Sequence, residues 1–428
     1  MVRRALFATT LLLFSAPALA EQAKPPAIAG YVTAVTSAAV FDVNGTHVRC
    51  TGQTQLQQAD AKDENLVSQS AQDRYIGQAI DIYGSANKKT HTIVATKVIV
   101  HPAPMGELSG TAIIDHIPAD STQAPGEHLF SADGYSILIT PKTQTTFTTP
   151  LTALTDVETN VWIKYTGKQR ADGVLVADTA VFTKNVVPKS EDKLRSKNEY
   201  DPKSVDPSSK QGAVSKHFLG VNPKKIPPYT NAEMQARIDR IGLSLIPAYQ
   251  RNLADADPTK IDFRFHLIDQ PKLHDAWTLP NGIILVPHQV VERLQNDSQL
   301  ATVLANGVAS AIEKQAVHDH TTKKAMDVIA DASYLSGIGE IAAAEYARSH
   351  VNSVILRHEQ EQSGRVSLVF LRDAGYDIHE APKAWWLLAP KKPGPMIDTP
   401  LPERAAYLYQ TIGTTWRSTS STNVTASE

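Results

Sequence analysis

The sequence has only one cysteine, Cys50, in a chain of 428 residues. A single thiol cannot form an intrachain disulfide, a four-cysteine zinc site or an iron–sulfur cluster. The chain also lacks an excess of one charge, because 42 Lys and Arg residues face 44 Asp and Glu residues. That balance argues against a nucleic-acid-binding or polybasic membrane-binding protein. Beyond residue 20, no run approaches the roughly 20 apolar residues that a transmembrane helix needs.

The first 20 residues predict a signal peptide. Arg3 and Arg4 form a basic start, an apolar run follows, and Ala18-Leu19-Ala20 supplies the small-x-small pattern of a cleavage site. No cysteine follows the apolar run, which excludes lipoprotein attachment. We therefore predict an exported protein, periplasmic or secreted, that begins near Glu21 and has no membrane span after the signal peptide is removed.

Residues 28–183 predict two tandem β-modules, 28–103 and 107–183, because a series of strand-like segments occurs twice in the same order. The repeated elements are strands that open at Gly30 and Gly110, tight turns at Asn44-Gly45 and Asp133-Gly134, and apolar segments at 80–84 and 163–167 and at 93–100 and 175–182. The order of elements resembles OB-like repeats and predicts two small barrels. Their strands have few aromatic or basic residues, which favours structural or protein-contacting modules over nucleic-acid binding.

The remainder of the chain divides into a polar segment, a third unit and a tail. Residues 184–229 are dominated by Lys, Ser, Asp and Pro and predict a flexible, solvated linker. Residues 230–416 predict a mainly α-helical α+β domain, in which a helix follows Asp297 or Ser298 as its cap. Residues 417–428 are rich in Ser and Thr and predict a disordered tail.

Four segments of the third unit carry a family resemblance in their order and spacing. They are Leu273–Val286, Ser298–Ala305, Arg357–Asp377 and Thr399–Arg404. Together they resemble the zinc metalloendopeptidase family that contains the HtpX heat-shock protease and the CAAX prenyl proteases. The similarity extends over residues 238–408 and implies a zincin-type fold.

The resemblance also locates the catalytic positions of that family. Its members use two histidines and a glutamate in a His-Glu-x-x-His motif, plus a glutamate from a later helix, to bind zinc and activate water. In this chain the two histidine positions are Asn306 and Ser310, and the general-base position is Gly307. The third-ligand position is Gln360, although a shift of one residue would place Glu359 or Glu361 there.

These replacements predict a degenerate member of the family with neither metal nor catalytic residues. Neutral amide and hydroxyl groups are poor zinc ligands, and glycine has no group that accepts a proton. The one local histidine cluster, His318-Asp319-His320, cannot place both imidazoles on one helix face, and we interpret it as solvated surface. No other cofactor motif is present.

The sequence thus favours an exported binding or scaffold protein whose partner is a protein or peptide of the cell envelope. Proteases of this type pair an extended peptide with an edge strand. The candidate strand here is Ile283, Ile284, Leu285 and Val286. Two alternatives are an active zinc metalloendopeptidase with displaced ligands, and an envelope polysaccharide binder that acts through the β-modules.

Overall fold

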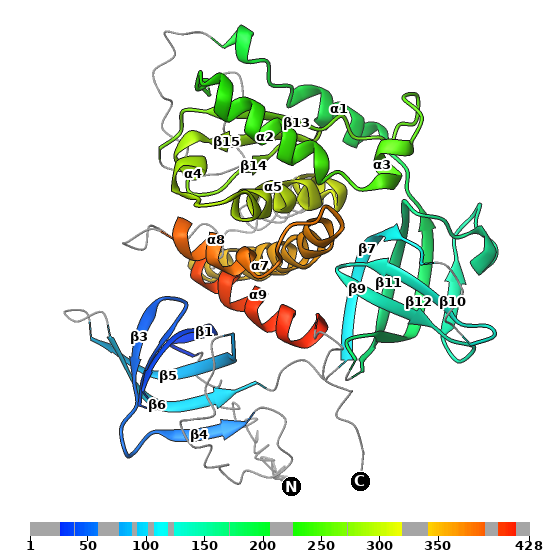
Figure 1. Cartoon of the computed structure of the whole chain (residues 1–428). Helices are drawn as coiled ribbons and strands as arrows, with labels where there is room; N and C mark the ends of the chain where they lie inside the picture. The colour runs from blue at the N-terminus through cyan, green and yellow to red at the C-terminus, as the bar shows by residue number, and fades with distance from the viewer. Residues whose placement is uncertain are drawn as a thin grey trace, which may run out of the picture.

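The computed structural model describes residues 26–37, 39–58, 77–87, 92–101, 107–118, 124–170, 172–205, 226–271, 273–318, 341–389 and 401–416, with only the backbone of 341–356. The predicted signal peptide, Asp319, His320 and the predicted tail at 417–428 lie outside the described residues. The described residues form two small β-barrels and a mainly helical unit, against which both barrels pack (Figure 1). The prediction of tandem β-modules followed by a helical domain is therefore confirmed.

The first barrel contains six strands in the order β3-β2-β1-β5-β6-β4, closed by a parallel β3–β6 pairing. They are β1 (Ile28–Ser37), β2 (Val40–Val43), β3 (Thr46–Arg49), β4 (Gln55–Gln58), β5 (Ala79–Asn87) and β6 (Thr92–Val100). Alternate residues point inward, so that Val32, Phe41 and Ile82 are fully buried in its core. The barrel is held together by its own apolar side chains.

The second barrel repeats this arrangement strand for strand. Its strands are β7 (Glu107–His116), β8 (His128–Ala132), β9 (Tyr135–Ile139), β10 (Gln144–Phe147), β11 (Val161–Gln169) and β12 (Leu175–Lys184). Their order is β10-β12-β11-β7-β8-β9, with β12 and β9 closing the barrel in parallel. In both barrels the predicted tight turn has two positive φ angles, 50° and 77° at Asn44-Gly45 and 55° and 73° at Asp133-Gly134, as a type I′ hairpin requires.

The segment predicted as a solvated linker is partly folded, which corrects that expectation. It contains α1 (Lys189–Lys197) and a short 3-10 helix, Pro202–Ser204. Tyr200 is fully buried in a cluster with Ile226 and Ile283. Glu191, only 4% exposed, pairs with Lys314 at 3.0 Å. These partners lie far along the chain, so the local polar composition does not reveal them.

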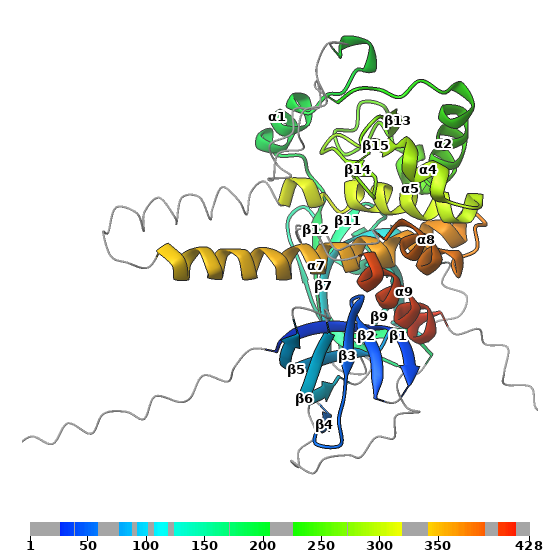
Figure 2. The same cartoon turned by 90° about the vertical axis from the view of Figure 1, so that its left-hand side faces the viewer.

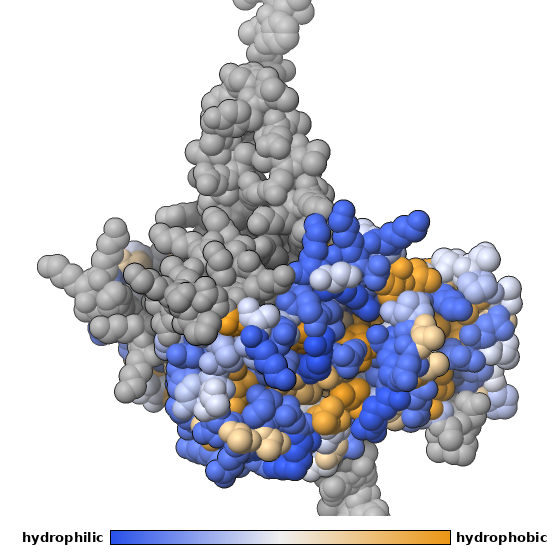
Figure 3. Space-filling model, turned by 90° about the horizontal axis from the view of Figure 1, so that it is seen from above, coloured by the Kyte–Doolittle hydropathy of each residue, from blue (hydrophilic) through white to orange (hydrophobic). Residues whose placement is uncertain are grey.

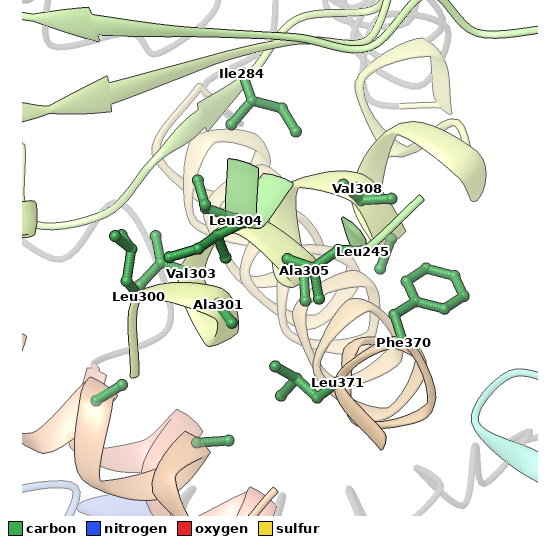
Figure 4. Packing of buried hydrophobic residues seen from close by; sticks show 14 of the residues in the cluster. Leu245, Ile284, Leu300, Ala301, Val303, Leu304, Ala305, Val308, Phe370 and Leu371 are labelled. Carbon is green, nitrogen blue, oxygen red and sulfur yellow. The ribbon is translucent and has the colours of Figure 1, made fainter. Parts of the chain in front are cut away.

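The helical unit is built on one buried helix beneath a three-stranded sheet. The sheet consists of β13 (Arg264–Ile268), β14 (Trp277–Thr278) and β15 (Ile283–Pro287), and the helices are α2 (Ala232–Ser244), α3 (Ala248–Asn252), α4 (His288–Arg293), α5 (Asp297–Ile312), α7 (Ile341–Asp373), α8 (Glu380–Leu388) and α9 (Leu401–Thr415). Figure 4 shows α5 between Ile284 of the sheet and Phe370 and Leu371 of α7. Since α5 is covered on several sides, 12 of its 16 residues are buried. Its cap is Asn296, whose side chain accepts the Gln299 N–H at 2.9 Å, rather than Asp297 or Ser298 as predicted.

The strand predicted to bind a peptide occupies the centre of this sheet, and the assignment is therefore corrected. β15 pairs with β13 in parallel and with β14 in antiparallel orientation, and all five of its residues are buried. Its continuous apolar run reflects burial on both faces. In the described part of the chain, β14 is the edge strand beside α5.

Helix α7 crosses the molecule, with α5 on one side and the first barrel on the other (Figure 2). Although α7 has 33 residues, none of the described helices combines the length and the apolar character that a membrane crossing demands. Among the described residues visible from above, most of the surface is hydrophilic, with separate hydrophobic areas (Figure 3).

Candidate functional site

Two of the predicted site positions line the same small pocket. Asn306 of α5 and Gln360 of α7 both border it. The space available to a water-sized sphere is about 10 Å³, roughly that needed by one water molecule. The third predicted position, Ser310, is half-buried on α5 but does not line the pocket. The remaining lining residues are Tyr31, Glu361, Gly364, Trp385, Glu403, Arg404, Tyr407 and Leu408.

Helix α5 holds Asn306 in place because the residues around it are buried. Leu300, Val303, Leu304 and Val308 are all fully buried, which fixes the rotation of the helix about its axis. Asn306 lies on the remaining half-buried stripe. The helix periodicity predicted from the sequence is therefore confirmed for this element.

Gly307, the general-base position, is pressed against the sheet. A Cβ atom at this residue would lie 3.1 Å from two methyl carbons of Ile284 and 3.1 Å from Thr278 Oγ1. The Thr278 hydroxyl also donates to the Gly307 carbonyl oxygen at 3.3 Å. Glycine inside a helix costs about 1 kcal/mol relative to alanine. The close approach of helix and sheet supplies a packing reason for it, which the sequence does not show.

The residue that completes the pocket comes from the first barrel. Tyr31 of β1 donates its hydroxyl to Glu361 Oε1 at 2.9 Å. Its ring lies 5.8 Å from the ring of Tyr407, with an angle of 59° between the planes. Burial raises the pKa of Tyr31 well above its ordinary value, and the neighbouring Glu361 raises it further. Tyr31 is therefore a neutral hydrogen-bond donor across the physiological pH range.

A second carboxyl group, that of Glu403 on α9, shapes the electrostatics of the site. Its side chain is only 2% exposed, and Arg357 Nη2 lies 2.8 Å from its Oε1. Burial raises the pKa of Glu403 to about 7, although Arg357 lowers it. The adjacent Arg404 bonds to Asp275 and lies over the ring of Trp385, 5.1 Å from its centroid. Glu403 therefore changes its charge near neutral pH.

The donor set of the pocket does not fit zinc. Asn306 and Gln360 offer neutral amides, whereas Zn²⁺ prefers imidazole, thiolate and carboxylate. Glu359 and Glu361 are the two carboxylates that a shift of one residue would place at the third-ligand position. Glu361 lines the pocket but accepts the hydrogen bond of Tyr31, and Glu359 does not line the pocket. Within the described ranges, no three His, Cys, Asp or Glu side chains are grouped closely enough to hold a metal ion. His318 is exposed, and its ring lies 6.1 Å from that of Trp162.

Sequence reasoning missed most of the residues that surround the two amides. Glu403 and Arg404 belong to a segment singled out for its family resemblance, but Tyr31 had no signal because it lies 330 residues from Glu361. Neither protein-family models nor curated proteins show a match to this chain.

Proposed function

We propose that the protein is an exported, non-catalytic peptide-binding or scaffold protein of the cell envelope, with a metallopeptidase-like domain at residues 230–416. The observation that carries this proposal is the packing of Gly307 against Ile284 and Thr278 at the position where the resembling family has its general base. Hydrolysis by such a site requires a carboxylate beside a metal-bound water. This position has no carboxylate, and any side chain there would have to displace Ile284 and Thr278 by a few tenths of an ångström.

The two neutral amides at the family's ligand positions support the same proposal. Asn306 and Gln360 are hydrogen-bonding groups that hold a polar ligand without polarising it as a metal would. The residue after Asn306, Gly307, contacts Thr278 of an edge strand, β14, that runs antiparallel to β15. The combination of an edge strand and polar pocket suits recognition of an extended peptide.

The peptide-binding edge is assigned to β14. The Leu279 N–H donates to the Ile283 carbonyl oxygen at 2.8 Å, toward β15. Because successive N–H groups of a strand point in opposite directions, the Thr278 N–H points away from β15. It is thus the group that a bound peptide strand would use.

The experiment tests catalysis and peptide binding on the purified mature chain. We expect no hydrolysis of casein and no zinc retained through dialysis, measured by elemental mass spectrometry. In a peptide-display panel, Thr278→Pro should weaken binding of selected peptides at least about tenfold, because one backbone donor is lost. Thr278→Val keeps that N–H and serves as the matched control. Zinc-dependent casein cleavage, or equal binding by both variants, would contradict the proposal.

A further inference from the structure

One wall of the pocket beside Asn306 is a side chain of distinctive chemistry, that of Tyr31. We propose that the position of the Tyr31 ring, between Glu361 and Tyr407, is a binding site for a tyrosine side chain, filled in the resting protein by Tyr31 itself. This inference deepens the proposed function, on which it rests for the idea that a partner's tyrosine replaces Tyr31. The pocket itself lies at the junction of α5, α7 and α9.

Both ends of the tyrosine side chain have a partner. The hydroxyl donates to Glu361 Oε1 at 2.9 Å, which is a charge-assisted hydrogen bond when the carboxylate is ionised. The ring is tilted against Tyr407, at a distance and angle typical of aromatic pairs. Phenylalanine would retain the ring contact but leave the carboxylate without its donor. The pocket therefore distinguishes tyrosine from phenylalanine.

The first barrel presents Tyr31 on a backbone that is fixed on both sides. The Asn44 side chain accepts the Tyr31 N–H at 2.9 Å and donates to the Ala29 carbonyl oxygen at 3.2 Å. It reaches them because Gly30 has no Cβ; such an atom would lie 2.0 Å from Asn44 Nδ2. The barrel thus holds one short, strand-like stretch around a single aromatic residue.

The second barrel shows that docking does not require this aromatic residue. By strand register, Tyr31 corresponds to Ile113, because Val32 pairs with Val43 before one turn and Ile114 pairs with Ala132 before the other. Ile113 is 1% exposed and packs in the core of the helical unit. Gln362 of α7, the neighbour of Glu361, donates to the Thr111 carbonyl oxygen at 2.8 Å. The same position of each barrel therefore packs against the helical unit, but only the first barrel brings a ring with a hydroxyl there. Tyr31 thus adds a hydrogen bond to Glu361, whereas the Ile113 side chain contacts the helical unit through apolar atoms.

The two barrels also differ in the ion pairs that they form with the helical unit. Arg365 of the helical unit forms an ion pair with Asp133 of the second barrel, at 2.5 Å. The ion pairs formed by described residues of the first barrel are internal to it, His47 with Asp42 and His101 with Asp81. Ion pairing therefore adds nothing, among the described residues, to the attachment of the first barrel. A competing tyrosine has to displace apolar contacts and hydrogen bonds only.

The test uses the full mature chain with Tyr31→Ala and two small probes, N-acetyl-L-tyrosinamide and N-acetyl-L-phenylalaninamide. The variant should bind the tyrosine probe at millimolar concentration or below and the phenylalanine probe at least about tenfold more weakly, as the loss of a hydrogen bond to a charged group predicts. The wild-type chain should bind the tyrosine probe at least about twofold more weakly than the variant, because the tethered Tyr31 competes at an effective concentration of about millimolar. Thr111→Ala, in the strand of the second barrel that contacts α7, keeps the carbonyl oxygen that accepts from Gln362 and is the control, which should behave as wild type. Titration is followed by NMR.

Equal affinity of Tyr31→Ala for both probes, or no binding by it, would overturn the inference. If that variant does not fold, Tyr31→Phe provides the second measurement. Because Tyr31→Phe loses the hydrogen bond to Glu361, backbone amide hydrogen exchange should become at least about fivefold faster in β1 and α9 but should not change in the second barrel. Unchanged exchange in β1 and α9 would also overturn the inference. Neither measurement uses β14 or a partner peptide, so the pocket assignment and the proposed peptide-binding function can fail independently.

Discussion

Arg365 and Asp133 form a buried ion pair between helix α7 and the type I′ turn of the second barrel. Arg365 Nη2 lies 2.5 Å from Asp133 Oδ1, and Arg365 Nε donates to the Asp133 carbonyl oxygen at 3.0 Å. Tyr165 donates to the other carboxylate oxygen at 2.7 Å. The Asp133 side chain is only 2% exposed. This pair therefore links barrel and helical unit in a region shielded from water.

Asp133→Asn should strongly destabilise the protein. The substitution leaves the Arg365 guanidinium buried without a counter-charge, which typically costs about 3–5 kcal/mol. The exposed ion pair between Arg170 and Asp172 offers the control, since Asp172→Asn should cost at most about 1 kcal/mol. Denaturant unfolding monitored by circular dichroism measures both. Similar losses of unfolding free energy for the two variants would contradict the expectation.

Stability should fall as the pH rises from about 4 to about 7. Burial raises the pKa of Asp115 from 3.8 to about 7, even though a hydrogen bond with Ser131 lowers it. Over this window the folded chain retains a proton that the unfolded chain has released, so the free energy of unfolding decreases with pH. Glu313 and Glu403 also have raised pKa values and act in the same direction.

Asp115→Asn measures how much the Asp115 carboxyl group contributes to the pH dependence of the free energy of unfolding. Because the amide stays neutral, the variant should be more stable than wild type at pH 8, by roughly 2–4 kcal/mol, and should lose part of the pH dependence. Thermal unfolding at pH 5 and pH 8 provides the comparison. Asp178→Asn, at an exposed residue of β12, is the control and should leave the pH profile of wild type. A variant that is less stable at pH 8 than wild type would refute the assignment.

Gly307→Ala should destabilise the protein although alanine favours helices. The added Cβ would lie 3.1 Å from Ile284 Cδ1, and overpacking of this kind costs about 1–3 kcal/mol against a helix gain of about 1 kcal/mol. Ile284→Val removes that methyl group. In a double-mutant cycle the two substitutions should therefore compensate, with a favourable coupling energy of about 1 kcal/mol or less. Strictly additive unfolding free energies would show that Gly307 is not packed as described.

Local signals in the sequence predicted the barrels and the buried helix. The Asn44-Gly45 and Asp133-Gly134 dipeptides specify turns on their own, and the spacing of Leu300, Val303 and Leu304 specifies a buried helix face. Other features depend on residues distant in the chain. The burial of Tyr200 depends on Ile283, and the position of Ile283–Val286 at the centre of the sheet depends on which strands pair beside them.

The candidate site could be predicted only in part, for the same reason. The family resemblance pointed to Asn306 and Gln360, and both line the pocket. It also pointed to Ser310, which does not line it. Tyr31 enters from a separate barrel, and no periodicity or motif near residue 31 encodes a contact with α7. Contacts between modules depend on surface complementarity, which a pattern within one module does not contain.

The corresponding hairpin turns of the two barrels carry different side chains toward the helical unit. Asn44 and Asp133 occupy corresponding turns and differ by a single atom, nitrogen in one side chain and oxygen in the other. Asn44 forms a hydrogen bond with Glu403, whereas Asp133 faces Arg365. If the barrels were exchanged, Asp133 would face the carboxyl group of Glu403, and Arg365 would face the uncharged Asn44. The residue at the first position of the hairpin turn is therefore one of the contacts that match each barrel to its own site on the helical unit.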